Sequence, residues 1–137
     1  MKKLITLALI ILSLNTFSQS NETTAFNKIK LLFNKSISCI TKSSQCSIFY
    51  NSDQKQFDID NTLIFLSKIK IEYNYNEAIP NRFHYVKFEC LEGNCIISST
   101  DKELIHSTAI SFSSKKECYD FIEAVSELKK ILMKNNN

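Results

Sequence analysis

The sequence predicts an α+β domain with an N-terminal helix, a curled antiparallel meander sheet of about six strands, and a C-terminal amphipathic helix packed on that sheet. Three patterns support this fold class. Apolar residues recur every three or four positions near both ends of the chain, and they alternate with polar residues at a period of two between those regions. Clusters of Asn, Asp and Ser, which are typical of turns, separate the alternating stretches.

The first helix is predicted from Thr24 to about Lys35, after a loose leader over residues 19–23. Its apolar side chains fall on one face, as expected for a helix packed on a sheet. The residues on this face are Phe26, Ile29, Phe33 and Ile37.

The central part of the chain predicts the strands. The strictest alternation runs from Lys68 to Tyr75, with one apolar and one polar face. Residues 51–54 are expected to turn a hairpin, and a loop containing Pro80 follows the strictest strand. The predicted strands cover residues 46–50, 57–60, 68–75, 84–90, 95–98 and 108–112.

The C-terminal helix is predicted from Lys115 to about Met133. Ser114 and Glu117 have the spacing of a capping box, in which side chains satisfy the first free backbone N–H groups of a helix. One apolar stripe follows the helical period. It consists of Cys118, Phe121, Ile122, Val125, Leu128 and Leu132.

Residues 1–18 have the pattern of a secretory signal peptide. Lys2 and Lys3 precede an apolar run over residues 4–12, and small polar residues follow, so cleavage is expected after Ser18 or Ser20. The run is shorter than the roughly 20 residues that cross a bilayer. We therefore expect an exported protein, periplasmic or secreted, without stable membrane insertion after cleavage.

The rest of the chain is expected to form a single domain over residues 24–134, with a disordered tail over 135–137. Loss of Lys2 and Lys3 lowers the formal charge by two, from +3 to +1. Near-neutral charge and a single arginine argue against a nucleic-acid partner. A single glycine cannot build a glycine-rich phosphate loop, and no cofactor is expected.

Five cysteines lie beyond the signal peptide, and export permits disulfides. Cys90 and Cys95 are expected to face each other across a four-residue hairpin loop and to form a structural bond. Cys39 and Cys46 can tie the first helix to the first strand. Cys118 is either a buried free thiol or the disulfide partner of Cys39 or Cys46. An unpaired thiol can also link two chains, so a monomer and a disulfide-linked dimer both stay open.

Catalytic and metal chemistry have little support. The two histidines, His84 and His106, have no neighbouring nucleophile in the sequence and no metal-ligand spacing. Asp58 and Asp60 are two residues apart on a predicted strand and can form an acid pair, although solvated edge charges explain them equally well. No catalytic or metal-binding residue is therefore assigned.

Aromatic residues gather at the ends of two predicted strands that pair through the Pro80 loop. They are Tyr73, Tyr75, Phe83 and Tyr85. An exposed aromatic patch is typical of a binding surface, whereas a buried one closes a core. This patch is the candidate ligand site.

The C-terminal half resembles pleckstrin-homology-like domains. The resemblance lies in a meander of strands that ends in Ala109–Ser114 and is followed by one long helix, and it covers roughly residues 46–134. The stretch from Val86 to Ile97, with its two cysteines, also resembles small exported bacterial proteins of unknown function. The chain lacks a tryptophan in the last helix and a basic loop between the first strands. Phosphoinositide binding is therefore not implied.

The expected function is that of a non-catalytic exported domain that binds a protein or a small apolar ligand, or supports an envelope assembly. Two alternatives stay open. One is a small secreted enzyme in which a histidine meets an acid or cysteine across the fold. The other is a secreted effector or toxin-like factor.

Overall fold

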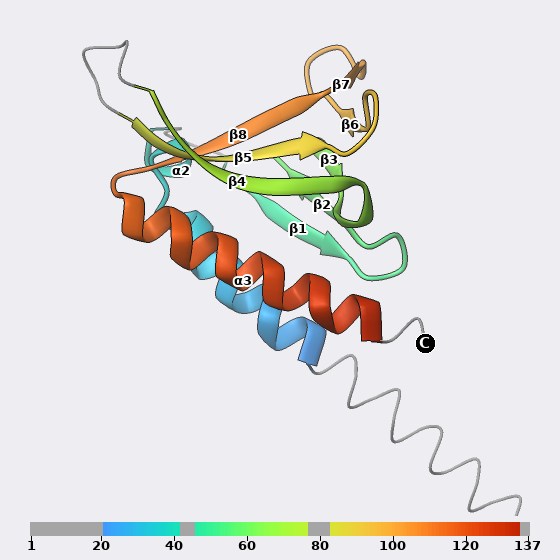
Figure 1. Cartoon of the computed structure of the whole chain (residues 1–137), viewed down its shortest axis with the longest axis horizontal. Helices are drawn as coiled ribbons and strands as arrows, with labels where there is room; N and C mark the ends of the chain where they lie inside the picture. The colour runs from blue at the N-terminus through green and yellow to red at the C-terminus, as the bar shows by residue number, and fades with distance from the viewer. Residues whose placement is uncertain (1–20, 42–45, 77–82, 135–137) are drawn as a thin grey trace, which may run out of the picture.

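The computed structural model describes residues 21–41, 46–76 and 83–134. The predictions for the signal peptide over residues 1–18, the Pro80 loop and the tail over 135–137 lie outside these residues. Within them, the α+β fold class is confirmed, with an N-terminal helix, antiparallel sheets and a C-terminal helix packed on them (Figure 1).

The first helix covers residues 21–34 of the described chain, so the loose leader predicted for residues 21–23 is wrong. The remaining elements, in chain order, are α2 (Ile37–Ile40), β1 (Ile48–Asn51), β2 (Gln56–Ile59), β3 (Thr62–Phe65), the 3-10 helix η1 (Leu66–Lys68), β4 (Ile69–Asn76), β5 (Phe83–Cys90), β6 (Ile96–Ile97), β7 (Leu104–Ile105), β8 (Ser107–Phe112) and α3 (Lys115–Lys134).

The described strands form two antiparallel sheets rather than one meander. The first sheet has the order β1-β2-β3-β6-β7, and the second has the order β4-β5-β8. The described residues contain eight strands instead of about six, because β3 and β7 were not predicted. β3 follows a two-residue turn at Asp60 and Asn61, whose φ angles of 50° and 66° match the turn that best suits a tight hairpin.

The expected hairpin between Cys90 and Cys95 is wrong. β6 does not pair with β5 but with β3 and β7, so the chain crosses from the second sheet to the first at residues 91–95. It returns at His106, whose carbonyl accepts a hydrogen bond from the Cys90 N–H (2.8 Å). The two cysteines nevertheless lie close together, because they bracket this crossing point.

The helices pack together against the sheets (Figure 1). An ion pair between Lys28 and Glu127, with Nζ and Oε2 3.4 Å apart, joins the first helix to α3. Ser114 caps α3 as predicted by accepting a hydrogen bond from the Glu117 N–H (3.2 Å), and Glu117 accepts one from the Ser113 N–H. The cap fixes the residue at which α3 begins. The apolar stripes of the first helix and of α3 both face the strands.

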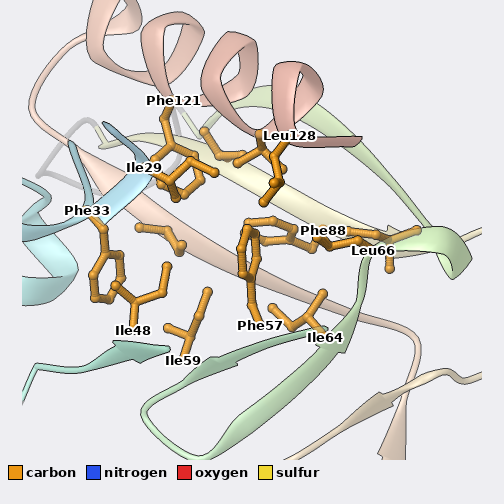
Figure 2. Packing of buried hydrophobic residues seen from close by; sticks show 14 of the residues in the cluster. Ile29, Phe33, Ile48, Phe57, Ile59, Ile64, Leu66, Phe88, Phe121 and Leu128 are labelled. Atoms are coloured by element: carbon orange, nitrogen blue, oxygen red, sulfur yellow. The ribbon is translucent and has the colours of Figure 1, made fainter. Parts of the chain in front are cut away.

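The core lies between the helices and the inner faces of the sheets. Figure 2 shows Phe57 and Ile64 of the first sheet pointing toward Leu128 of α3, with Phe88 of the second sheet between the layers. Each of these four side chains is at most 1% exposed. A ligand or a partner can therefore reach the outer faces of both sheets and the ends of the strands.

Candidate functional site

An aromatic surface lies where β4, β5 and the start of α3 meet. We define it as Tyr73, Tyr75, His84, Lys115 and Tyr119. The Tyr73 ring stacks on Tyr119 (5.4 Å between centroids) and on His84 (5.9 Å), and Tyr75 contacts His84 (5.0 Å). The Lys115 ammonium lies over the rings of Tyr73 and Tyr119, 5.5 and 5.8 Å from their centroids.

The strand register explains part of this arrangement. Tyr75 lies opposite His84, and Tyr73 lies opposite Val86, so the two tyrosines share the face that α3 covers. Tyr85 pairs with Asn74 and Ser111, which places it on the opposite face. The structure therefore brings Tyr73 and Tyr75 together and separates Tyr85 from them.

Phe83, the fourth residue of the predicted patch, pairs with Asn76 at the start of β5. The patch prediction missed the contributions of α3 and of His84. Lys115 and Tyr119 are four residues apart and so share one helix face, a signal that was readable in the sequence. Their docking beside β4 was not readable, because it depends on the packing of α3.

The Tyr73 hydroxyl forms a hydrogen bond with His84 Nδ1 (2.9 Å). Burial, followed by nearby Cys118 and the other tyrosines, raises the pKa of Tyr73. The phenol therefore stays neutral and fixes the His84 ring. Tyr75 and Tyr119 remain 36% and 50% exposed, so their rings are available to a ligand.

The edge strand β4 adds backbone groups to this surface. The Lys68 carbonyl accepts a hydrogen bond from Leu91, on the β5 side, whereas the Ile69 carbonyl accepts one from Lys129 Nζ (2.8 Å), on the other side. Backbone direction alternates along a strand, so the N–H and C=O groups of Tyr73 and Tyr75 point away from β5. Among the strands that the structure describes, β4 thus lies at the edge of its sheet, and aromatic rings line it.

The two histidines have defined contacts. His106 Nδ1 lies 2.7 Å from the Gly93 carbonyl, and its Nε2 lies 3.1 Å from Glu89 Oε1. His106 thus meets an acid across the fold, as the enzyme alternative requires. Both ring nitrogens, however, lie within hydrogen-bond distance of these oxygen atoms. Neither nitrogen is therefore left to activate a nucleophile.

Asp58 and Asp60 do not form an acid pair. Asp58 lies on the outer face of β2, opposite Phe49 and Leu63. Asp60 leaves the strand at the β2–β3 turn, where its Oδ1 accepts a hydrogen bond from the Ser47 N–H (2.9 Å). Its role is to hold the start of the first sheet.

The cysteines form two disulfides, Cys39–Cys46 and Cys90–Cys95, with Cα atoms 5.2 and 5.7 Å apart. The first ties α2 to the start of β1, and the second closes the crossing between the sheets. Cys118 is free and fully buried, and burial raises the pKa of its thiol to about 11. Its position favours a core role over disulfide linkage.

A cavity of about 380 Å³ opens between the start of β3 and β8. Phe33 and Ile110 supply apolar walls, and Ser38, Thr62 and Thr108 line it as well. Ser38 Oγ also accepts a hydrogen bond from the Ser111 N–H (2.9 Å), so this polar wall helps to seat α2 on β8.

No family model, curated protein or solved structure matches this chain. Among the described residues, no three His, Cys, Asp or Glu side chains are grouped as a metal-ligand set. Within that same part of the chain, no helix has both the length and the apolar character needed to span a membrane.

Proposed function

We propose that the protein is an exported, non-catalytic binding domain whose partner protein docks on the aromatic surface. The observation that carries this proposal is the continuous series of ring contacts from Tyr75 through His84 and Tyr73 to Tyr119, with Tyr75 and Tyr119 36% and 50% exposed at its two ends. Tyrosine is enriched among the residues that dominate protein interfaces, because it buries a large area and orders few rotatable bonds.

The free edge of β4 supports an extended partner segment. Such a segment can pair with the outward N–H and C=O groups of Tyr73 and Tyr75 while its side chains contact the rings. Lys129 occupies the Ile69 carbonyl at one end of this edge. The docking site is therefore the half of β4 next to the aromatic surface.

The histidine contacts support a structural role for one histidine and a positioning role for the other. His106 has both ring nitrogens within hydrogen-bond distance of oxygen atoms. His84 Nδ1 is held by the Tyr73 hydroxyl, which orients the His84 ring within the aromatic surface.

Export is supported by the two disulfides, which are compatible with an oxidising compartment. Intact-mass measurement with and without reductant tests this point. We expect a chain cleaved after Ser18 or Ser20 and carrying two disulfides. Full-length protein that retains Met1 inside the cell would contradict export.

Site-specific photo-crosslinking tests the aromatic surface. A photoreactive phenylalanine analogue in place of Tyr119 should give one discrete protein adduct in the exported fraction, and Tyr75→Ala should weaken it. The matched control is the analogue in place of Tyr85, on the opposite face of the sheet. Equal products at both positions, or none at Tyr119, would refute the proposal, and an adduct of small-molecule mass would favour an apolar ligand instead.

A further inference from the structure

The outward faces of the two sheets differ in chemistry. The second sheet carries paired charges there, with Lys70 Nζ 2.8 Å from Glu89 and 3.2 Å from Glu72, and Lys87 Nζ 3.0 Å from Glu89. This is the polar face expected of an antiparallel sheet in contact with water. The outward face of the first sheet can be compared with this polar face.

The first sheet carries an apolar row on its outward face. Residues that lie opposite one another across its five strands form this row, which consists of Phe49, Asp58, Leu63, Ile97 and Leu104. The next residue along each strand, such as Ile48, Ile59 or Ile64, is buried in the core instead. Four of the five outward positions are therefore apolar, and Phe49 and Leu104 are 61% and 55% exposed.

A concavity continues the apolar row toward the Cys90–Cys95 disulfide. It has a volume of about 510 Å³ and is lined by Phe65, Leu91 and Leu104 together with Lys68. Leu91 is 61% exposed, and Lys68 Nζ lies 5.2 Å from the centre of the Phe65 ring. The row and the concavity together form one surface that a side chain from another molecule can enter.

Asp58 places on this surface a carboxylate oxygen for which the described part of the chain supplies no hydrogen-bond donor. Its Oδ1 is out of contact with solvent and has no hydrogen-bond partner among the described residues. The same holds for Oε1 of Gln56, two residues away on the same face, a side chain only 7% exposed. An acceptor removed from water without a donor costs free energy, and a carboxylate costs more than an amide.

We propose that the apolar row binds a protein partner through a segment that places one arginine or lysine between apolar side chains. The cation would compensate Asp58, and its apolar neighbours would cover Phe49 and Leu63. Charge complementarity selects this occupant over a second copy of the chain. In a face-to-face dimer centred on this row, Asp58 meets either another Asp58 or an apolar residue, because Lys68, which lies in the concavity, is placed over the Phe65 ring and not within the row.

The proposal is independent of the aromatic surface, which lies on β4, β5 and α3. NMR titration of the folded, disulfide-bonded protein tests it with the peptide acetyl-Leu-Arg-Leu-amide as the probe. We expect saturable amide shifts centred on Phe49, Asp58, Leu63 and Ile97. The neutral peptide acetyl-Leu-Gln-Leu-amide should bind several-fold more weakly.

Two variants make this test specific. Asp58→Asn should weaken binding of the arginine peptide by about fivefold, which is the upper end of the range for one partly exposed ion pair. The affinity of this variant for the arginine peptide should then be close to the affinity of the wild type for the glutamine peptide. Glu72→Gln, on the outward face of the second sheet, should leave it unchanged. Thermal unfolding of each variant verifies that the fold is retained.

Three results would overturn the proposal. The first is equal binding of the arginine and glutamine peptides. The second is a set of shifts located away from the first sheet. The third is a concentration-dependent dimer in analytical ultracentrifugation that Leu63→Asp or Phe49→Ser dissolves, because that result assigns the face to a second copy.

Discussion

The Cys118 thiol is shielded from reagents in the folded protein. Its side chain lies on the buried stripe of α3, and burial raises the pKa of the thiol to about 11. Since the thiolate is the nucleophile, the folded protein presents almost no reactive sulfur at neutral pH.

Iodoacetamide labelling at neutral pH should therefore leave the folded protein unmodified and add one group in denaturant without reductant. Reduction before labelling should raise the number to five, which matches the cysteines in the chain. Mass spectrometry reads all three states. Labelling of the native protein would show that the stripe of α3 opens easily.

Local chemistry made several single residues predictable. Asn51 accepts hydrogen bonds from the backbone of Asp53 and Gln54, both at 3.0 Å, and so forms the expected turn. Ser114 caps α3 for the same reason, because its hydroxyl acts within three residues. The separation of Tyr85 from Tyr73 is also local, since it follows from alternation along two paired strands.

At the scale of elements, the ion pairs on the outward face of the second sheet predict acid sensitivity. Hydrogen bonds from Lys70 and Lys87, and a weaker one from His106, lower the pKa of Glu89 from an ordinary 4.5 to about 2. A carboxylate whose pKa is lowered on folding stabilises the fold above its unfolded pKa. This stabilisation is lost as the pH falls from about 4.5 toward 2.

Urea unfolding at several pH values should show the stability of the wild type falling across this window. Glu89→Gln should fall less steeply, with a residual slope from Glu117, whose pKa is lowered by the Ser113 hydroxyl. Glu72→Gln should keep the wild-type slope because Glu89 is still present. A Glu89→Gln profile parallel to that of the wild type would contradict this assignment.

The Cys39–Cys46 disulfide is the covalent connection between α2 and the first sheet. It closes a loop with a sequence separation of seven residues. Loss of this constraint in the Cys39→Ser, Cys46→Ser double variant should lower the free energy of unfolding by about 2.5 kcal/mol. Urea titration measures the change, and a loss near zero would mean that packing alone seats α2.

The order of the strands could not be predicted from the sequence. Cys90 and Cys95 have the spacing of a hairpin, but Ile96 and Ile97 pair with β3, far earlier in the chain. β3 itself was missed because it begins directly after a two-residue turn without glycine, at Asp60 and Asn61. Pairing between distant segments depends on which faces fit together, and alternation within one segment does not contain that information.

At the scale of the whole molecule, one core joins both helices to both sheets. Phe57 is fully buried among the side chains of this core (Figure 2). Phe49, on the adjacent strand of the same sheet, is 61% exposed. Phe57→Ala should lower the free energy of unfolding by about 3 to 5 kcal/mol, because it leaves a cavity.

Phe49→Ala is the matched control and should change stability by less than about 0.5 kcal/mol, as is usual for exposed positions. Chemical denaturation of both variants supplies the comparison. Similar losses in the two variants would mean that the outward face of the first sheet is covered in the isolated protein. That result would also argue against its being free to bind a partner.

The functional surfaces were the least predictable feature. Tyr73 and Tyr75 share a face because of alternation, which the sequence contains. Tyr119 joins them only because α3 docks beside β4, and Leu104 joins Phe49 only because β7 completes the first sheet. Both surfaces are assembled from elements that meet through tertiary packing.

The crossing of the chain between the sheets also determines how the molecule can fold. β1, β2 and β3 are connected by short turns and can pair as soon as they are synthesised, whereas β3 receives its other neighbour, β6, about thirty residues later. Distant pairings form slowly because a long loop must close first. While the chain folds, β3 therefore has an open edge until β6 arrives, and such an unpaired edge is a place where another chain can add a strand.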